Sequence, residues 1–397
     1  MRQTRTIGVV EQGGLSQRDG QGGSLSPVRR PLCVEATDAL ADGVFAAVSS
    51  RVPPGLLELV SDVRAPSGLI VIGPRASATC RKLSRVNPSL PRIVDFARYE
   101  DFVASASAPM PWPDAEGMWA WSLDQWVDGI VAAGADVVFS PSGIIRTGDS
   151  KALAAVIDSG NGVKRPQLVT TVAVHQAWLT ETYLANLQDE IERSERPVGL
   201  VVVGKLDPFE ELEVAQGLLD LFDSCPGQIF LHRTDNLAAV HAIVQPGLGA
   251  SIGVTSSLRH TIPQGRRAQA RGSVNRQPAV YVFVPGINEF RDIEEVESWF
   301  GDRVPCCAMP ECCGRRLNDF SRHADDLDIL AVHNVRGWLT ILEDLVAHES
   351  CDRRGWLYRY FQDVESAYIA LRAESNVRSI IPCGSAEVWR RLYNRLS

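Results

Sequence analysis

The chain has 397 residues, of which 45% are hydrophobic, and this is enough to bury either one barrel-sized domain or two smaller ones. Its formal net charge of −8 excludes a generally basic surface, so a contact with nucleic acid would need a local basic patch. The sequence contains no apolar run of the ~18–20 residues that a membrane span requires, and its first residues, MRQTRTIG, lack the apolar core of a signal peptide.

Residues 1–30 are rich in Gly, Ser, Gln and Arg and poor in apolar side chains. Such a composition predicts a disordered tail, because the segment cannot bury enough surface to offset the entropy of ordering it. The next segment, PLCVEATDALADGVFAAVSS, is interpreted as a short strand at Leu32–Glu35 followed by a helix.

From there an apolar run and a helical pattern alternate along the chain. Seven further runs are LIVIG (69–73), RIVDF (92–96), DVVFS (136–140), LVTTVAV (168–174), GLVVVG (199–204), QIFLH (228–232) and GASIGV (249–254). Helices are predicted at Leu179–Arg193, Pro208–Phe222 and Asn236–Val244, the last with Asn236 as its N-cap. Eight such repeats predict an α/β fold, a closed (β/α)8 TIM-like barrel over residues 31–285, with a doubly wound open sheet as the alternative.

In a parallel barrel the chemistry gathers where the strands end. Asp95 lies in the apolar surroundings of RIVDFARY, where an unpaired charge would be costly, so it is a candidate catalytic group or the ion-pair partner of Arg98 or Arg92. Asp207 and Asp235 are either candidate catalytic carboxylates or helix caps. Other polar residues at predicted strand ends are Ser140, Ser142, His175, Gln176, Lys205, Arg233, Ser256, Ser257, Arg259 and His260.

A basic segment, SSLRHTIPQGRRAQARGSVNRQ, follows the last predicted strand and contains no acidic residue. Its arginines are Arg259, Arg266, Arg267, Arg271 and Arg276. A basic loop beside a barrel mouth suits contact with a phosphate backbone, and a solvated loop is the alternative interpretation.

Four of the nine cysteines fall within eight residues, at Cys306, Cys307, Cys312 and Cys313, and His333 follows on an amphipathic segment. Thiolates and imidazole are preferred ligands of Zn²⁺, so three of these cysteines and His333 would fill a closed, structural zinc site within residues 286–350. The residues leave open which cysteine is excluded. An odd number of cysteines with a metal-like cluster favours a reducing cytoplasm over a disulfide framework.

Barrel strands followed by an Arg-rich loop, a Cys-rich knuckle and the segment His333-Asn334-Val335-Arg336 resemble the tRNA-guanine transglycosylase family. That family includes relatives that place 7-deazaguanines in DNA. The resemblance, which spans about residues 60–350, implies zinc on three cysteines and His333, a nucleic-acid partner (tRNA or DNA) and a guanine-type base. It makes Asp95 a catalytic candidate, because RIVDFARYE is placed like the family strand that carries a catalytic aspartate. It places the base near Ser140, Ser142, His175, Gln176, Gly204 and Lys205, and phosphate near Arg259, His260, Arg266, Arg267 and Arg271.

The chain also departs from the family pattern. The cysteines read CC-x4-CC instead of C-x-C-x-x-C, the segment GASIGVTSSLRH lacks the nucleophilic carboxylate, and FSPSGI has serines where the family has an aspartate. A serine would need an activating base, which His260 could supply to Ser257. Otherwise Asp95, Asp207 or Asp235 replaces the nucleophile, or the reaction is lost.

Three functions therefore stand as hypotheses. The first is a divergent base-exchange enzyme, and the second is a non-catalytic family member that binds nucleic acid or a partner subunit. The third is a small-molecule nucleoside or sugar enzyme, for which a Lys205 of depressed pKa would be the signature.

Aromatic patterns suggest how the remaining segments pack. Residues 351–397 contain two amphipathic helical patterns, which are expected to pack on the barrel or to form a homodimer surface. A cluster of tryptophans is expected to belong to core and lid, with base stacking as the alternative; its members are Trp112, Trp119, Trp121 and Trp126.

Overall fold

The computed structural model describes residues 34–62, 67–111, 122–204, 207–261, 279–375, 377, 380–382 and 384–396. All of them belong to one compact unit, Pro31–Ser397. The disordered tail expected at residues 1–30 lies outside the described residues, as do Lys205, Arg266, Arg267, Arg271 and Arg276.

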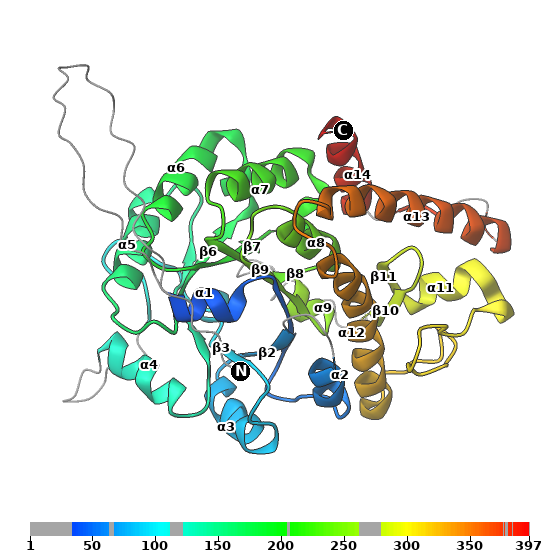
Figure 1. Cartoon of the computed structure of the whole chain (residues 1–397), viewed down its shortest axis with the longest axis horizontal. Coiled ribbons are helices and arrows are strands. Elements are labelled where there is room, and N and C mark those ends of the chain that lie inside the picture. The colour runs from blue at the N-terminus through cyan, green and yellow to red at the C-terminus, as the bar shows by residue number, and fades with distance from the viewer. Residues whose placement is uncertain are drawn as a thin grey trace, which may run out of the picture. The chain divides into compact units, whose positions relative to one another are not determined.

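The core of this unit is a closed barrel of eight parallel strands, as the sequence predicts (Figure 1). Around the ring the strands follow the order β1, β2, β3, β4, β6, β7, β8 and β9, and β9 pairs with β1 to close it. Their bounds are β1 Gly43–Val48, β2 Ser67–Ile72, β3 Arg92–Asp95, β4 Val137–Phe139, β6 Leu168–His175, β7 Val198–Val203, β8 Ile229–Thr234 and β9 Gly249–Gly253. The two-residue strand β5, Ile144–Ile145, pairs with the end of β6 and thereby extends the line of β4.

Helix α1, Val34–Leu40, precedes the first strand. The helices that follow the strands around the barrel are α2 Leu56–Asp62, α3 Ala76–Val86, α4 Leu123–Val131, α5 Ser150–Asn161, α6 Glu181–Glu192, α7 Leu212–Ser224, α8 Asn236–Val244 and α9 Ser256–Arg259. Short 3-10 turns are η1 Arg98–Glu100, η2 Gln176–Leu179 and η3 Pro208–Glu210. Among the described helices, none is both long and apolar enough to span a membrane.

The first predicted strand is wrong, although the other seven apolar runs all form barrel strands. Val34 and Glu35 begin helix α1, and the strand is Gly43–Val48, which the sequence places in a helix. Every residue of β1 is buried between β2 and β9, so ladder pairing and burial on both faces outweigh the helix propensity of its alanines. Helix α1 instead contributes Ala36 and Leu40 to the apolar cluster inside the barrel.

One predicted cap is also wrong. Asp235, not Asn236, caps α8, because its side chain accepts a hydrogen bond from the Ala238 amide at 2.9 Å. The Asn236 side chain donates to the Asn288 carbonyl at 2.8 Å, which ties α8 to the segment after the barrel.

Aromatic rings fill the barrel interior. The rings of Phe45 and Phe139 each pack edge-on against Phe230 at 5.8 Å between centroids. In such a packed barrel, the functional groups are expected at the ends of the strands. Outside the barrel, Trp126 on α4 is buried against Phe96, which confirms the core interpretation for this residue; Trp112, Trp119 and Trp121 lie outside the described residues.

In the described residues after the barrel, the chain forms a hairpin, four α-helices and one 3-10 turn. These elements are β10 Tyr281–Val284, β11 Glu289–Asp292, α11 Ile293–Phe300, η4 Gly301–Arg303, α12 Ala324–Val346, α13 Arg353–Glu374 and α14 Gly384–Leu396. In Figure 1 the hairpin and α11 lie to one side of the barrel, with α12 between them and the ring. The C-terminal helices pack on the barrel's own helices, since the Trp389 ring of α14 stacks on His241 of α8 at 4.2 Å.

Candidate active site and metal centre

A cavity of about 160 Å³ lies at the carboxyl ends of β7, β8 and β9. Three strand-end loops of the barrel, the β10–β11 hairpin and the first turn of α14 all contribute to its wall. The residues that line it are Asp207, Glu210, Asp235, Asn236, Leu237, Ser256, Arg259, His260, Tyr281, Glu289, Phe290 and Ser385. It therefore brings together Asp207, Asp235, Arg259 and His260 from the sequence-derived candidates.

Asp207 is the group in this cavity best suited to exchange a proton near neutral pH. It follows β7 and caps η3, where its carboxylate accepts a hydrogen bond from the Phe209 amide at 3.0 Å. Burial, followed by the nearby charge of Asp235, raises the pKa of Asp207 to about 7. A hydrogen bond with the Ser385 side chain acts in the opposite direction.

Asp235 follows β8 and is buried at the N-terminus of α8. Burial raises its pKa, while hydrogen bonds from the Ala238 and Leu237 amides and the charge of Arg259 favour the ionised form. Both carboxylates are thus helix caps, as one sequence interpretation predicts, and both also face the cavity.

Arg259 and His260 come from α9 and the residue after it. The Arg259 guanidinium is 3% exposed and stacks over the Phe290 ring at 3.7 Å. Burial lowers its pKa to about 10, so it remains charged at neutral pH. Burial and the charges of Arg259 and Arg233 lower the pKa of His260 to about 3, so its imidazole is neutral there. Within the described chain the hydrogen-bond partner of the Ser257 hydroxyl is Thr255, at 3.2 Å, and not His260.

Asp95 is held deep in the barrel and does not belong to the described lining of this cavity. Its carboxylate, 1% exposed, accepts hydrogen bonds from the Ala97 amide (2.7 Å), the Tyr99 hydroxyl (2.7 Å) and His232 Nε2 (2.9 Å). Burial alone would raise the pKa of Asp95, but the hydrogen bonds from His232 and Tyr99 lower it overall. The ion pair expected with Arg98 or Arg92 is wrong.

Those two arginines have other partners. Arg98 pairs with Asp101 at 3.2 Å and Arg92 with Asp136 at 3.4 Å, both outside the barrel interior. The Asp95 carboxylate is held instead by the Ala97 amide, the Tyr99 hydroxyl and the His232 imidazole.

His232 extends this buried network to a third strand. Its Nδ1 lies 2.7 Å from the Ser251 hydroxyl, which in turn accepts a hydrogen bond from the Arg233 amide at 2.9 Å. The Ser251 proton therefore points to Nδ1, and Nε2–H donates to Asp95. The sequence gives a signal for these partners, since His232 and Ser251, like Asp95, are polar residues inside apolar strand runs.

The serines expected near the base are engaged with each other. Ser140 and Ser142, both buried, lie 2.7 Å apart between their hydroxyl oxygens, and Ser140 also accepts a hydrogen bond from the Thr171 amide at 2.8 Å. Burial of both hydroxyls therefore comes with satisfied hydrogen bonds within the barrel wall.

Gln176 and Gly204 lie side by side at the ends of β6 and β7. A methyl group added at Gly204 would overlap Oε1 of the buried Gln176 side chain, so only glycine fits there without displacing it. His175 Nδ1 accepts a hydrogen bond from the Ala177 amide at 3.2 Å and thereby caps η2. The structure thus brings together two residues, Gln176 and Gly204, for which the family resemblance implies a contact with the base.

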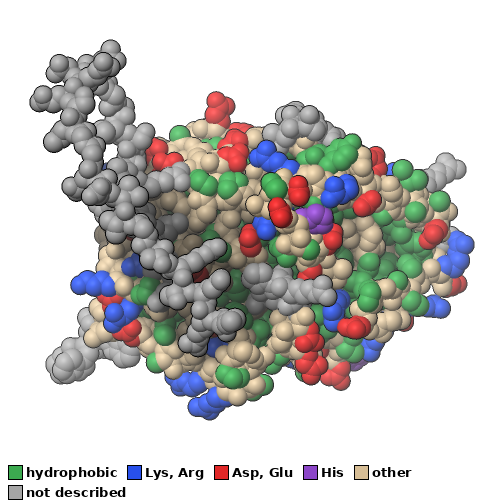
Figure 2. Space-filling view, viewed as in Figure 1, with side chains coloured by type: hydrophobic (Ala, Val, Ile, Leu, Met, Phe, Trp, Pro, Cys, Tyr) green, Lys and Arg blue, Asp and Glu red, His purple; other side chains and the backbone are tan. Residues whose placement is uncertain are grey.

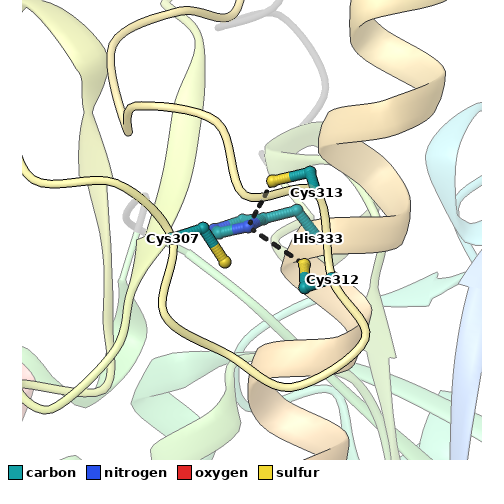
Figure 3. A group of neighbouring side chains, drawn as sticks. All are labelled: Cys307, Cys312, Cys313 and His333. Atoms are coloured by element: carbon teal, nitrogen blue, oxygen red, sulfur yellow. Dashed lines mark hydrogen bonds between the residues drawn. The ribbon is translucent and has the colours of Figure 1, made fainter.

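A second cluster, Cys307, Cys312, Cys313 and His333, could hold a metal ion (Figure 3). The possible ligand atoms of the four side chains all lie within 4.8 Å of one another. The Sγ atoms of Cys312 and Cys313 are each 3.5 Å from His333 Nδ1. Cys306 is the cysteine left out: it is exposed, and its backbone pairs with Arg316.

The residues around His333 fix its orientation. His333 Nε2 lies 2.8 Å from the Phe283 carbonyl and donates to it, which leaves Nδ1 as the ligand atom. The neighbouring Asn334 side chain accepts from the Phe283 amide at 2.7 Å and donates to the Tyr281 carbonyl at 2.9 Å. Adjacent residues of α12 thus hold strand β10, whose Tyr281 lines the cavity at the barrel mouth.

Sequence reasoning misses several lining residues, among them Tyr281, Glu289 and Ser385, which come from segments far along the chain with no motif of their own. On the face shown in Figure 2, described Lys and Arg side chains are interspersed with Asp and Glu. Neither a scan of protein-family models nor a search of curated proteins finds a match to this chain.

Proposed function

We propose that this chain is a divergent tRNA-guanine transglycosylase that exchanges a guanine-type base in tRNA or DNA at the cavity of the barrel mouth. Three observations support the proposal together: the closed barrel, the Cys3His cluster that follows it, and the contact between Gln176 and Gly204. In the family, the corresponding glutamine and glycine strand hold the base from two sides.

The observation that carries the proposal is the pair of unequal carboxylates. Glycosidic chemistry needs one carboxyl group that is ionised and one that exchanges a proton near the working pH. Burial raises the pKa of both carboxyl groups, but hydrogen bonds from helix amides and the charge of Arg259 support the ionised form of Asp235. We therefore assign the ionised role to Asp235 and the second role to Asp207, whose pKa is raised to about 7. The pair replaces the nucleophile that the segment after β9 lacks.

The reaction then proceeds in two displacements. Asp235 attacks the sugar C1′, the C1′–N bond breaks, and the leaving base takes a proton from Asp207. The incoming base gives a proton back to Asp207 and attacks C1′, which breaks the ester bond to Asp235. Atoms and protons balance over the cycle, and no other reactant is required.

We further propose that the Cys3His cluster binds zinc in a structural role. In a tetrahedral site with Zn–S of about 2.3 Å and Zn–N of about 2.0 Å, a sulfur and a nitrogen ligand lie roughly 3.5 Å apart. The two distances from His333 Nδ1 to sulfur are 3.5 Å. Zinc would fasten the cysteine knuckle to α12. Because α12 also holds the β10–β11 hairpin, zinc would help to position Tyr281 and Glu289. The three thiols bind metal only when reduced, which fits a cytoplasmic protein.

The test is an exchange assay in which labelled guanine or a labelled 7-deazaguanine is supplied with tRNA and, separately, with duplex DNA. Label enters one polymer with the wild-type protein, and the rate falls at least about 100-fold in Asp207→Asn and in Asp235→Asn. Asp189→Asn, on the exposed side of α6, is the matched control and keeps the wild-type rate.

A second function is favoured by one observation: Ser140 and Ser142, which stand where the family has a base-binding aspartate, are hydrogen-bonded to each other. A non-catalytic subunit that binds nucleic acid or a partner chain would need no carboxylate there. Nucleic acid bound without incorporation, at one zinc per chain, would establish this alternative and exclude base exchange.

A further inference from the structure

The C-terminal helix reaches the barrel mouth. Ser385, the second residue of α14, is buried and lines the cavity together with Asp207 and Asp235. Beside it, Gly384 packs so closely on η3 that an added methyl group would lie 2.8 Å from Glu210 Cγ. The first turn of α14 is therefore fitted against the turn that Asp207 caps.

Ser385 contacts Asp207 directly, since its hydroxyl donates a hydrogen bond to the carboxylate. A neutral donor of this kind favours the ionised form of a carboxyl group. The positive end of the α14 helix dipole acts in the same direction.

The other groups around Asp207 come from several elements. Asp235 on the α8 side and Glu210 on η3 oppose ionisation of Asp207, and the cavity also contains Arg259, His260, Tyr281 and Glu289. His260 is neutral near pH 7, so it contributes no charge there. Among the described groups, the Phe209 amide and Ser385 both hydrogen-bond the Asp207 carboxylate and favour its ionised form against the two acidic neighbours.

We propose that Ser385 is a positioning residue, which orients the Asp207 carboxylate and supports its ionised form, so that helix α14 is a working wall of the reaction site. The link to catalysis depends on the proposed base exchange, but the hydrogen bond itself does not. Each time Asp207 releases its proton, the Ser385 hydroxyl is in place to donate a hydrogen bond to the carboxylate.

The first experiment requires no activity. The free energy of unfolding of the full chain is measured from pH 4 to pH 9, and the difference from Asp207→Asn gives the pKa of Asp207. Ser385→Ala is expected to raise this pKa by about one unit, the effect of one lost hydrogen bond to a charged group. Ser385→Thr keeps the hydroxyl and restores the wild-type value.

Ser366→Ala is the matched control, because Ser366 is an exposed helical serine that donates to the Gln362 carbonyl. It should leave the pKa of Asp207 unchanged. An unchanged pKa in Ser385→Ala would overturn the proposal. If Ser385→Ala does not fold, Ser385→Cys, which has a similar shape and a much weaker donor, decides the same question.

The second experiment is the pH profile of kcat/KM for base exchange. The titration assigned to Asp207 should move up by the same amount in Ser385→Ala, with KM for the base nearly constant. A shifted pKa with an unmoved rate profile would overturn the positioning role. A shifted pKa without exchange by any variant would support the hydrogen bond and exclude the proposed function.

Discussion

Asp207 and Asp235 follow neighbouring strands of the barrel and face one cavity, where burial and then the charge of Asp235 raise the pKa of Asp207 to about 7. Burial also raises the pKa of Asp235, while helix amides and Arg259 act in the opposite direction and support its ionised form. Two carboxylates in such unequal surroundings can divide the roles of nucleophile and proton carrier. The difference between the two carboxylates can be tested by measuring the free energy of unfolding as well as the rate of base exchange.

The pH dependence of stability should carry the signature of Asp207. Because its folded-state pKa of about 7 lies above its unfolded value near 4, the group stabilises the fold fully only below about pH 4, and this contribution is lost as the pH rises through 7. Asp207→Asn should therefore gain on the order of 2–4 kcal/mol relative to the wild type between pH 4 and pH 8. Urea unfolding at several pH values measures this, and parallel curves for the two proteins would exclude the raised pKa.

Asp95 is expected to contribute to the free energy of unfolding through its buried hydrogen bonds. Asp95→Ala leaves the Tyr99 hydroxyl, the His232 N–H and the Ala97 amide without their acceptor inside the barrel, and should cost about 3–5 kcal/mol. Asp189→Ala, at an exposed helical site, should change the free energy of unfolding by less than about 0.5 kcal/mol. Equal effects of the two substitutions, measured by chemical denaturation, would contradict the buried network.

The proposed zinc site predicts a difference between neighbouring cysteines. Cys312→Ser should lose the bound zinc and lower the unfolding temperature, because it removes one of four ligands. Cys306→Ser should keep one zinc per chain, because Cys306 lies outside the cluster. Metal content by mass spectrometry decides this, and zinc loss in both variants would show that the cluster is wrongly assigned.

Gly204 should tolerate no side chain. Gly204→Ala displaces the Gln176 amide, and under the proposed function this misplacement lowers kcat/KM by up to about 100-fold. Gly355→Ala is the control, since an added methyl group there meets only the distant end of Arg359 on the surface of α13. Wild-type exchange kinetics in Gly204→Ala would remove Gln176 from the base site.

Local patterns predict much of this fold. Apolar runs such as RIVDF and GLVVVG become buried strands, because both faces of a parallel sheet are covered. The sequence does not predict the strand Gly43–Val48, because its alanines favour a helix. Pairing with β2 and β9 determines its structure instead. The cysteine spacing predicts the cluster, but only the path of the knuckle separates Cys306 from Cys307.

The cavity could be predicted only in part. Asp207 and Asp235 are visible as polar residues at strand ends, whereas the position of Ser385 depends on how α14 packs, which no local pattern encodes. Asp95 has the strongest signal in the sequence, and that signal indicates burial with hydrogen-bond partners from strand β8 and from the segment after β3. Sequence identifies an unusual carboxylate more readily than the contacts that decide its role.

The most direct test of the carboxylate pair is to trap the covalent intermediate. Wild-type protein incubated with the polymer it modifies, without an incoming base, should form an adduct that survives denaturation, and peptide mass spectrometry should place the sugar ester on Asp235. Asp235→Asn should form no adduct. Base exchange with the ester on another residue, or with no adduct on Asp235, would contradict the assignment of the barrel-mouth cavity as a carboxylate-based exchange site.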